Sequence, residues 1–206
     1  MKVRPFRLLT IGYGLATVLP CLGLHPALAD ELRGHSTIGI QTVGLSAGPF
    51  FPIRVLPGQS SKLFGAAVMP SWSIILTDPI GSSWHQGRLA VGAELLAVGM
   101  SEPMPASGIG VTPKLHYTFT AWGRLRPYVE GGGGPLWTDL GGRVPEQPGQ
   151  FNFVVWGGAG CAWLLTPQWA VQAGYRFVHI SNAGTRSQNA GLNFGLPFVG
   201  FTYQLF

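Results

Sequence analysis

Residues 171–193 read VQAGYRFVHISNAGTRSQNAGLN. If the part up to residue 181 is a β-strand, its side chains alternate between two faces. One face is apolar until it ends in two polar residues: Val171, Ala173, Tyr175, Phe177, His179 and Ser181. The other face carries Gln172, Gly174 and Arg176. In a soluble protein a potential catalytic pair would not continue the apolar stripe, so the pattern indicates a strand whose apolar face contacts lipid.

The first 29 residues have the three parts of a secretory signal peptide. A basic start with Lys2, Arg4 and Arg7 is followed by an apolar segment over residues 8–24 and by the small-residue cleavage site at residues 27–29. We therefore expect residues 1–29 to be a signal peptide and residues 30–206 to form one exported domain. Removal of the signal peptide takes away three of the 13 basic residues and none of the eight acidic ones. The formal charge therefore falls from +5 to +2. No basic cluster remains, so we expect no nucleic-acid partner.

The composition of the remaining chain is typical of a membrane β-protein. Only 10% of the residues are charged, against about a quarter in ordinary soluble domains. After the signal peptide no apolar run is long enough for a membrane helix. What recurs instead is the strand of roughly ten residues that crosses a bilayer at a tilt. The eight strands that we expect span residues 36–47, 63–77, 86–98, 109–121, 124–137, 151–164, 169–181 and 194–206.

In the strands with the clearest pattern, polar and apolar residues alternate, so that the polar residues share one face and the apolar residues share the other. The phase expected to face inward is polar and includes Arg88, Glu94, Lys114, His116, Arg124, Arg126, Tyr128, Glu130, Gln172 and Arg176. The other phase is apolar, as in Val199, Phe201 and Leu205. We expect long connections after strands one, three, five and seven and short ones after four and six, which matches long extracellular loops and short periplasmic turns. The sequence therefore predicts an all-β fold, an eight-stranded antiparallel transmembrane β-barrel of the bacterial outer membrane.

In this orientation His179 and Ser181 lie at the extracellular end of the seventh strand and on its lipid-facing side. Two neighbours on one face of a strand are about 7 Å apart at Cα, so the imidazole can lean towards the hydroxyl. A serine needs such a base because its hydroxyl is a weak nucleophile at neutral pH. The base needs a partner on its other ring nitrogen. A His-x-Ser motif alone is a weak signal and is better explained by two interfacial residues at a strand end.

The surrounding sequence narrows these alternatives. The run YRFVHISNAG at residues 175–184, followed by NAGLN at 189–193 and a terminal Phe206, resembles the lipid A 3-O-deacylase (acyloxyacyl hydrolase) family of outer-membrane barrels. The run RPYVEGG at residues 126–132 is similar to that family's middle section. In this family a serine, a histidine and a glutamate hydrolyse the ester-linked 3-hydroxyacyl chain at position 3 of lipid A. The resemblance covers roughly the last eighty residues of the chain.

The resemblance implies roles for individual residues. Ser181 would be the nucleophile and His179 the general base. The acidic member falls on Asn193, which can orient the histidine but is not an acid, and no Asp or Glu follows Glu146 in the sequence. Backbone N–H groups around Asn189 and Gly191 would form an oxyanion hole, with Asn182 ordering the loop. An ordinary turn at residues 189–191 is the alternative.

Three functions follow as hypotheses. The first is an esterase that acts on lipid A of lipopolysaccharide in the outer leaflet, without a cofactor or a metal ion. The second is a barrel of the same descent that has lost catalysis and serves as a structural or lipid-binding outer-membrane protein. The third, a small-solute porin, is disfavoured because side chains fill barrels of eight strands. His35, His85 and His116 lack the mutual spacing of metal ligands. A homodimer is left open.

Overall fold

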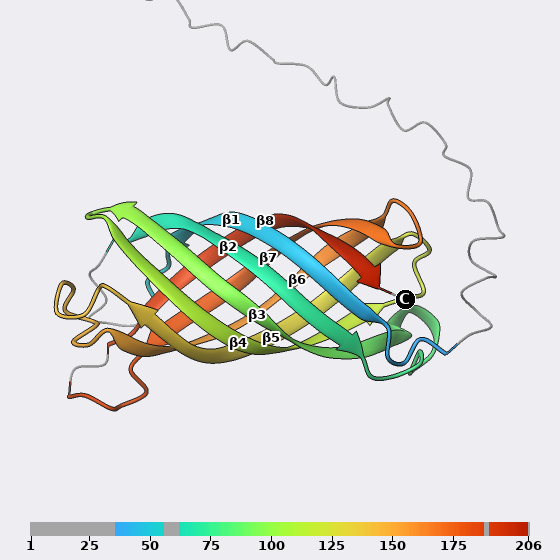
Figure 1. The fold of residues 1–206 in the computed structure, drawn as a ribbon, viewed down its shortest axis with the longest axis horizontal. Coiled ribbons are helices and arrows are strands. Elements are labelled where there is room, and N and C mark those ends of the chain that lie inside the picture. Colours follow the sequence, from blue (N-terminus) through green and yellow to red (C-terminus); the bar gives the residue numbers. More distant parts are fainter. Residues whose placement is uncertain (1–35, 56–61, 188–189, 206) are drawn as a thin grey trace, which may run out of the picture. The chain divides into compact units, whose positions relative to one another are not determined.

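The computed structural model describes residues 36–55, 62–187 and 190–205. The expected signal peptide at residues 1–29, Asn189 and the terminal Phe206 lie outside this part. The described elements are β1 (Gln41–Pro52), β2 (Phe64–Ile75), the 3-10 helix η1 (Ser83–His85), β3 (Gly87–Glu102), β4 (Ala106–Phe119), β5 (Leu125–Thr138), β6 (Phe151–Leu164), β7 (Trp169–Ser181) and β8 (Leu192–Leu205). The eight strands form a closed antiparallel barrel in sequence order (Figure 1). The predicted fold class is confirmed.

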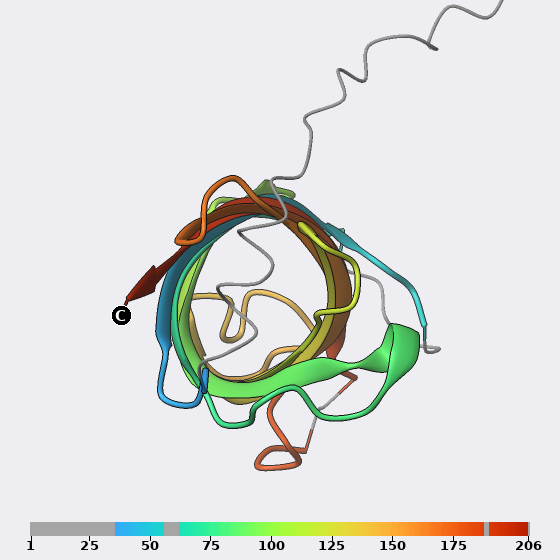
Figure 2. The same ribbon diagram turned by 90° about the vertical axis from the view of Figure 1, so that its right-hand side faces the viewer.

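The barrel closes by pairing β8 with β1. This pairing runs from Gln41 opposite Leu205 to Pro52 opposite Phe194. Figure 2 shows the resulting ring of strands end-on. Closure satisfies every strand edge, which a sheet needs in a membrane because lipid offers no hydrogen-bond partner. The start of β1 and the end of β8 consequently lie at the same end of the barrel, as expected for an even number of strands.

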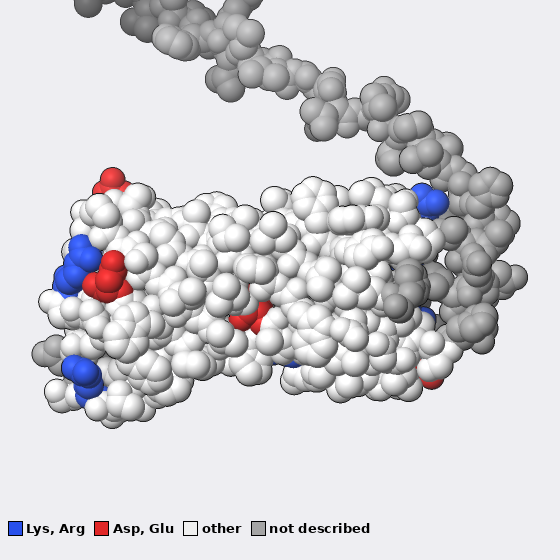
Figure 3. Space-filling model, viewed as in Figure 1, with Lys and Arg blue, Asp and Glu red and all other residues white. Residues whose placement is uncertain are grey.

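The outer surface of the barrel is apolar. Each strand exposes at least one large apolar side chain: Leu45, Val68, Leu95, Val111, Val129, Val155, Phe177 and Val199. On the face shown in Figure 3, charged residues gather at the two ends and the middle is almost uncharged apart from one acidic spot. This uncharged band is the surface that an outer-membrane barrel presents to lipid. Within the described ranges, no helix has the length and apolar character needed to span a membrane.

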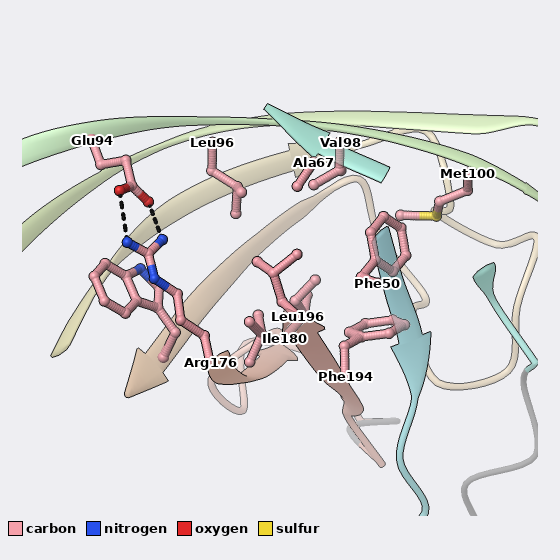
Figure 4. A pocket seen from close by; sticks show the side chains of 12 residues that line it. Phe50, Ala67, Glu94, Leu96, Val98, Met100, Arg176, Ile180, Phe194 and Leu196 are labelled. Atoms are coloured by element: carbon pink, nitrogen blue, oxygen red, sulfur yellow. Dashed lines mark hydrogen bonds and ion pairs between the residues drawn. The ribbon is translucent and has the colours of Figure 1, made fainter. Parts of the chain in front are cut away.

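The interior of the barrel is organised around Arg176, which is 3% exposed. Its guanidinium donates to both carboxylate oxygens of Glu94 at 2.6 and 3.0 Å and to Glu130 at 2.8 Å. His116 lies 3.4 Å from Glu130, and Lys114 lies 3.8 Å from Glu94. In Figure 4, Arg176 meets Glu94 at one side of an apolar cavity that Leu196 and Phe194 also line. These groups belong to the predicted inward-facing phase, and they form ion pairs inside the barrel.

The other inward-phase arginines do not join this cluster. Arg126 donates instead to the backbone oxygen of Thr120 at 2.7 Å. Arg88 and Arg124 form no ion pair with Glu94 or Glu130. These arginines lie near the ends of their strands, whereas both carboxylates lie in the middle of the barrel. The shared inward-facing phase was thus predicted correctly. The phase did not show how far along the barrel axis each side chain lies.

Two expected boundaries were wrong. The first strand begins at Gln41 instead of residue 36 and continues to Pro52, because its pairing with β8 extends that far. The connection after the third strand comprises only residues 103–105 and is not a long loop, because Gly99 pairs with Ser107 and Met100 with Ala106. The sequence between the two strands is rich in Ser, Pro and Gly, a composition that predicts a loop. Its backbone nevertheless pairs as a hairpin, because strand pairing uses backbone groups and does not require apolar side chains.

Pro70 does not end β2, although proline removes a ladder hydrogen bond. The pairing of β2 with β3 skips residues 69 and 70, and the pairing with β1 continues through Pro70 opposite Leu45. The missing N–H therefore interrupts the ladder on one side only.

Replacing Arg176 by methionine should destabilise the barrel strongly. The substitution leaves the carboxylates of Glu94 and Glu130 buried without their shared cation, which typically costs about 3–5 kcal/mol. The measurement is urea unfolding of the protein refolded in lipid vesicles. The matched control is Arg143→Met, since Arg143 is exposed and lies 3.6 Å from Asp139, and exposed pairs contribute about 1 kcal/mol or less. Equal losses in the two variants would contradict this account of the interior.

Candidate functional site

His179 and Ser181 lie at the end of β7 that leads into the connection formed by residues 182–191. The burial of this strand alternates: Val178 and Ile180 are 6% and 3% exposed, whereas Phe177 is 39% exposed. His179 and Ser181 share the phase of Phe177. The structure therefore places both side chains on the outer, lipid-facing surface of the barrel.

Asn193 lies directly opposite His179, on β8. Its Oδ1 is 2.7 Å from His179 Nδ1. Because an amide oxygen can only accept a hydrogen bond, Nδ1 carries the proton and donates it. The other ring nitrogen, Nε2, is then the one that can accept a proton. The cross-strand register thus fixes both the orientation and the tautomer of the imidazole.

Ser181 is the next residue on the same face, about 7 Å away at Cα. In the described part of the chain, no hydrogen bond joins its hydroxyl to the ring of His179. Catalytic hydrogen bonds are often long in the absence of substrate, and rotation of either side chain changes their separation. The arrangement places a hydroxyl and an imidazole side by side at the outer-leaflet end of the barrel.

Gly191 approaches the ring of His179 from the start of β8. Its φ is +67°, and a Cβ built there would lie 2.6 Å from Cε1 and 3.3 Å from Nε2 of His179. Glycine is required on both counts, because a side chain would be strained at this φ and would collide with the ring. The backbone of Gly191 therefore passes close to the nitrogen that can accept a proton.

Asn182 follows Ser181 and is fully buried. Its Oδ1 accepts from the backbone N–H of Gly184 at 2.9 Å, and its carbonyl accepts from the N–H and hydroxyl of Thr185 at 3.0 and 2.8 Å. Ala183 and Gly184 both have positive φ, at 51° and 77°. Asn182 thus holds the tight turn by which the chain leaves β7.

One contact of this site was not predicted from the sequence. In the end-on view the connection between β5 and β6 lies within the outline of the ring (Figure 2), and its residues Leu140, Val144, Glu146 and Gln147 are at most 5% exposed. Gln147 Nε2 donates to the backbone oxygen of Ile180 at 3.3 Å. Ile180 stands between His179 and Ser181, so the loop supports this segment from inside. The two partners are 33 residues apart, and no sequence periodicity signals such a contact.

The described residues contain no group of three or more His, Cys, Asp or Glu side chains that could hold a metal ion. The candidate reacting groups are the side chains of β7 and β8 already described. Their chemistry is that of a hydroxyl beside an oriented imidazole, which is the arrangement used for acyl transfer.

Comparisons with known proteins identify the family. The sequence model of lipid A 3-O-deacylase (PagL) matches residues 67–202, a range that includes His179, Ser181 and Asn193. The chain belongs to the lipid A 3-O-deacylase family. The resemblance seen in the sequence is confirmed, and the family is one of ester hydrolases. No curated protein sequence matches the chain.

Solved structures agree with this family on the fold. The crystal structure of the outer membrane enzyme PagL is similar with a TM-score of 0.53 and 22% identity, covering 77% of this chain and 97% of that one. Neisserial surface protein A gives a TM-score of 0.53 and 14% identity, covering 81% and 97%. The protein is an outer-membrane β-barrel, as predicted. Since the barrel is shared with a surface protein, function has to be argued from the site.

Proposed function

We propose that this member of the lipid A 3-O-deacylase family is an esterase that removes the 3-hydroxyacyl chain from position 3 of lipid A. The observation that carries the proposal is the 2.7 Å bond between His179 and Asn193 next to Ser181 on the lipid-facing surface. Lipid A forms the outer leaflet of the bacterial outer membrane. Its acyl esters lie at the depth of this end of the barrel, so the substrate can reach Ser181 by lateral diffusion.

In the proposed mechanism Ser181 Oγ attacks the carbonyl carbon of the ester, and His179 Nε2 takes the hydroxyl proton. The same nitrogen then returns the proton to the leaving sugar oxygen, which leaves an acyl-enzyme on Ser181. Water, deprotonated by Nε2, hydrolyses this ester and regenerates the serine. The products are a 3-hydroxy fatty acid and lipid A with a free hydroxyl at position 3.

Two groups assist these steps in the proposal. Asn193 accepts from Nδ1–H and keeps Nε2 aimed along the barrel surface. Backbone N–H groups of the loop containing Asn189 and Gly191 stabilise the negative charge that develops on the carbonyl oxygen. Asn182 contributes indirectly, because it orders the turn that follows Ser181.

A second candidate function is favoured by the identity of residue 193. An amide oxygen orients the imidazole, but it cannot stabilise the imidazolium as a carboxylate does. Slow chemistry is the expected consequence, and its extreme is a barrel that binds lipid A or serves the membrane structurally without hydrolysing it. This alternative uses the same surface and predicts no release of fatty acid.

Ser181→Ala and His179→Ala should each lower the deacylation rate by about a thousandfold or more, as expected when a nucleophile or its base is removed. The measurement is release of 3-hydroxy fatty acid from purified lipid A by the wild type and each variant. Val199→Ala is the control, because Val199 also faces lipid and is 67% exposed. Full activity of both variants would show that the roles are assigned wrongly.

The identity of residue 193 gives a separate test. Asn193→Glu should raise the rate, because a carboxylate stabilises the charged imidazolium in the transition state. Asn193→Ala should lower it by about a hundredfold, on the scale of removing one preorganised polar group. Both are compared with the wild type in one detergent and on one lipid A preparation.

The outcomes separate the two candidate functions. If wild type and Asn193→Ala are equally inactive while Asn193→Glu gains activity, the protein is a lapsed enzyme. If all three are equally active, residue 193 is not the partner of His179 in catalysis.

A further inference from the structure

A groove opens on the lipid-facing surface of β1, β2 and β3, across β8 from His179. Its volume is about 680 Å³, and its lining includes Phe51, Phe64, Ala66 and Gly99. The groove is separate from the reacting groups of the proposed mechanism, and that mechanism gives it no role.

The shape of the groove comes from two small residues between aromatic ones. Ala66 of β2 and Gly99 of β3 lie directly opposite each other. Phe51 and Phe64 are 37% and 45% exposed beside them. A Cβ built on Gly99 would have no heavy atom within 4 Å. The floor of the groove is therefore open, and an apolar chain can lie on it.

The groove lies next to the segment of β8 that carries Asn193. Phe51 pairs with Gly195 across the β1–β8 junction, and a Cβ on Gly195 would lie 2.8 Å from the ring of Phe51. Gly195 is two residues from Asn193, whose carbonyl accepts from the N–H of Ile53 at 2.8 Å. From Gly195 to the middle of the groove is two strand spacings, about 10 Å. Both sites thus lie in the outer-leaflet half of the barrel and face the same lipid.

Two cations stand at the loop end of this groove. Arg54 follows β1 and Lys62 precedes β2, and both are exposed. Lys62 shares the outward side of Phe64, because Leu63 between them is fully buried. In the part of the chain that the structure describes, neither cation has an ion pair. Lys and Arg do gather at this end of the barrel (Figure 3).

Two other cations at the same end are already engaged. Arg143 lies 3.6 Å from Asp139. Arg186 donates to the backbone oxygen of Pro148 at 3.3 Å. Arg54 and Lys62 therefore remain to meet an anionic ligand, and together they outweigh the exposed carboxylate of Glu102, which lies opposite Phe64.

We propose that this groove, with Arg54 and Lys62 above it, is a second acyl-chain subsite. It holds a non-reacting acyl chain and a phosphate of the lipid A molecule whose 3-acyl ester lies at Ser181; the identity of that ester rests on the proposed function. Lipid A joins several acyl chains to one phosphorylated disaccharide, so it presents an apolar chain and an anion together. Arg and Lys bind phosphate by charge-assisted hydrogen bonds. Contacts of this kind bind the ground state and the transition state of the substrate equally, so they lower KM without changing kcat.

Two groove variants and two controls test this subsite. Gly99→Leu fills the groove, and the double variant Arg54→Gln/Lys62→Gln removes the cations. Gly131→Leu is the control for bulk, since Gly131 faces lipid on β5 and a Cβ there would have Trp156 O as its nearest neighbour, at an ordinary 3.4 Å. Arg143→Gln is the control for charge. The substrates are bisphosphorylated lipid A and a 4-nitrophenyl ester of a 3-hydroxy fatty acid, which has one chain and no phosphate.

With lipid A, the double variant should raise KM by about fivefold for each cation removed, on the scale of a basic residue at an anionic membrane surface, and leave kcat unchanged. Gly99→Leu should raise KM several-fold, and the controls should match the wild type. With the small ester, all five proteins should be alike. The proposal is overturned if the groove variants behave as the controls do on lipid A, or if the small ester is affected equally.

A binding measurement separates failure of the subsite from failure of the proposed function. Each variant is made in the Ser181→Ala background, and native mass spectrometry gives the fraction of protein carrying bisphosphorylated lipid A. Lower occupancy in the groove variants supports the subsite even if the wild type releases no fatty acid, a result that would end the esterase proposal alone. Equal occupancy in all variants, with an active wild type, would end the subsite proposal alone.

Discussion

The backbone of a membrane protein has to satisfy its own hydrogen bonds, and every other feature of this structure depends on that constraint. The pairing of β8 with β1 closes the sheet, and closure divides the side chains of each strand into an inner and an outer set. The inner set of β7 contains Arg176, held by Glu94 and Glu130. A slip of one residue would turn every side chain of the strand to the other face. The buried ion pairs therefore fix the phase that directs His179 and Ser181 towards lipid.

This arrangement explains how an apolar strand face can end in reactive groups. The interior of the barrel is occupied by side chains, so a substrate with several acyl chains has access to the outside only. The hydrogen bond from His179 to Asn193 links β7 to β8 across the outer surface, while Gln147 holds the carbonyl of Ile180 from within. The proposed site is thus braced on both faces of one strand.

The strands that bear the site could be predicted closely from the sequence. The expected ranges 151–164 and 169–181 are those of β6 and β7, because alternation is clear in the second range and a short turn joins the two. The hairpin between β3 and β4 was missed, since its polar and small residues show no apolar face. Alternation gives the face of a residue and not its depth, which is why Arg126 was grouped with Arg176. The outward direction of His179 followed from alternation, but Asn193 was placed by family resemblance alone.

Contacts that depend on closure of the barrel or on loops could not be predicted from the sequence. Phe51 and Gly195 meet only because the first and last strands pair, and this meeting joins the groove to the proposed active site. Gln147 reaches Ile180 only because the β5–β6 connection folds into the barrel. Periodicity describes one strand at a time, so it carries no information about which distant strands become neighbours. The physical requirement for closure supplies that information for β1 and β8, but none for the loops.

The most direct test of the central claim is mass spectrometry of lipid A from cells that produce the wild-type protein or its Ser181→Ala variant. Both proteins should be present in the outer membrane as folded barrels. The account predicts that wild-type cells contain lipid A lighter by one 3-hydroxyacyl chain and that Ser181→Ala cells do not. Identical lipid A in the two strains, with folded wild-type protein in the membrane, would contradict it.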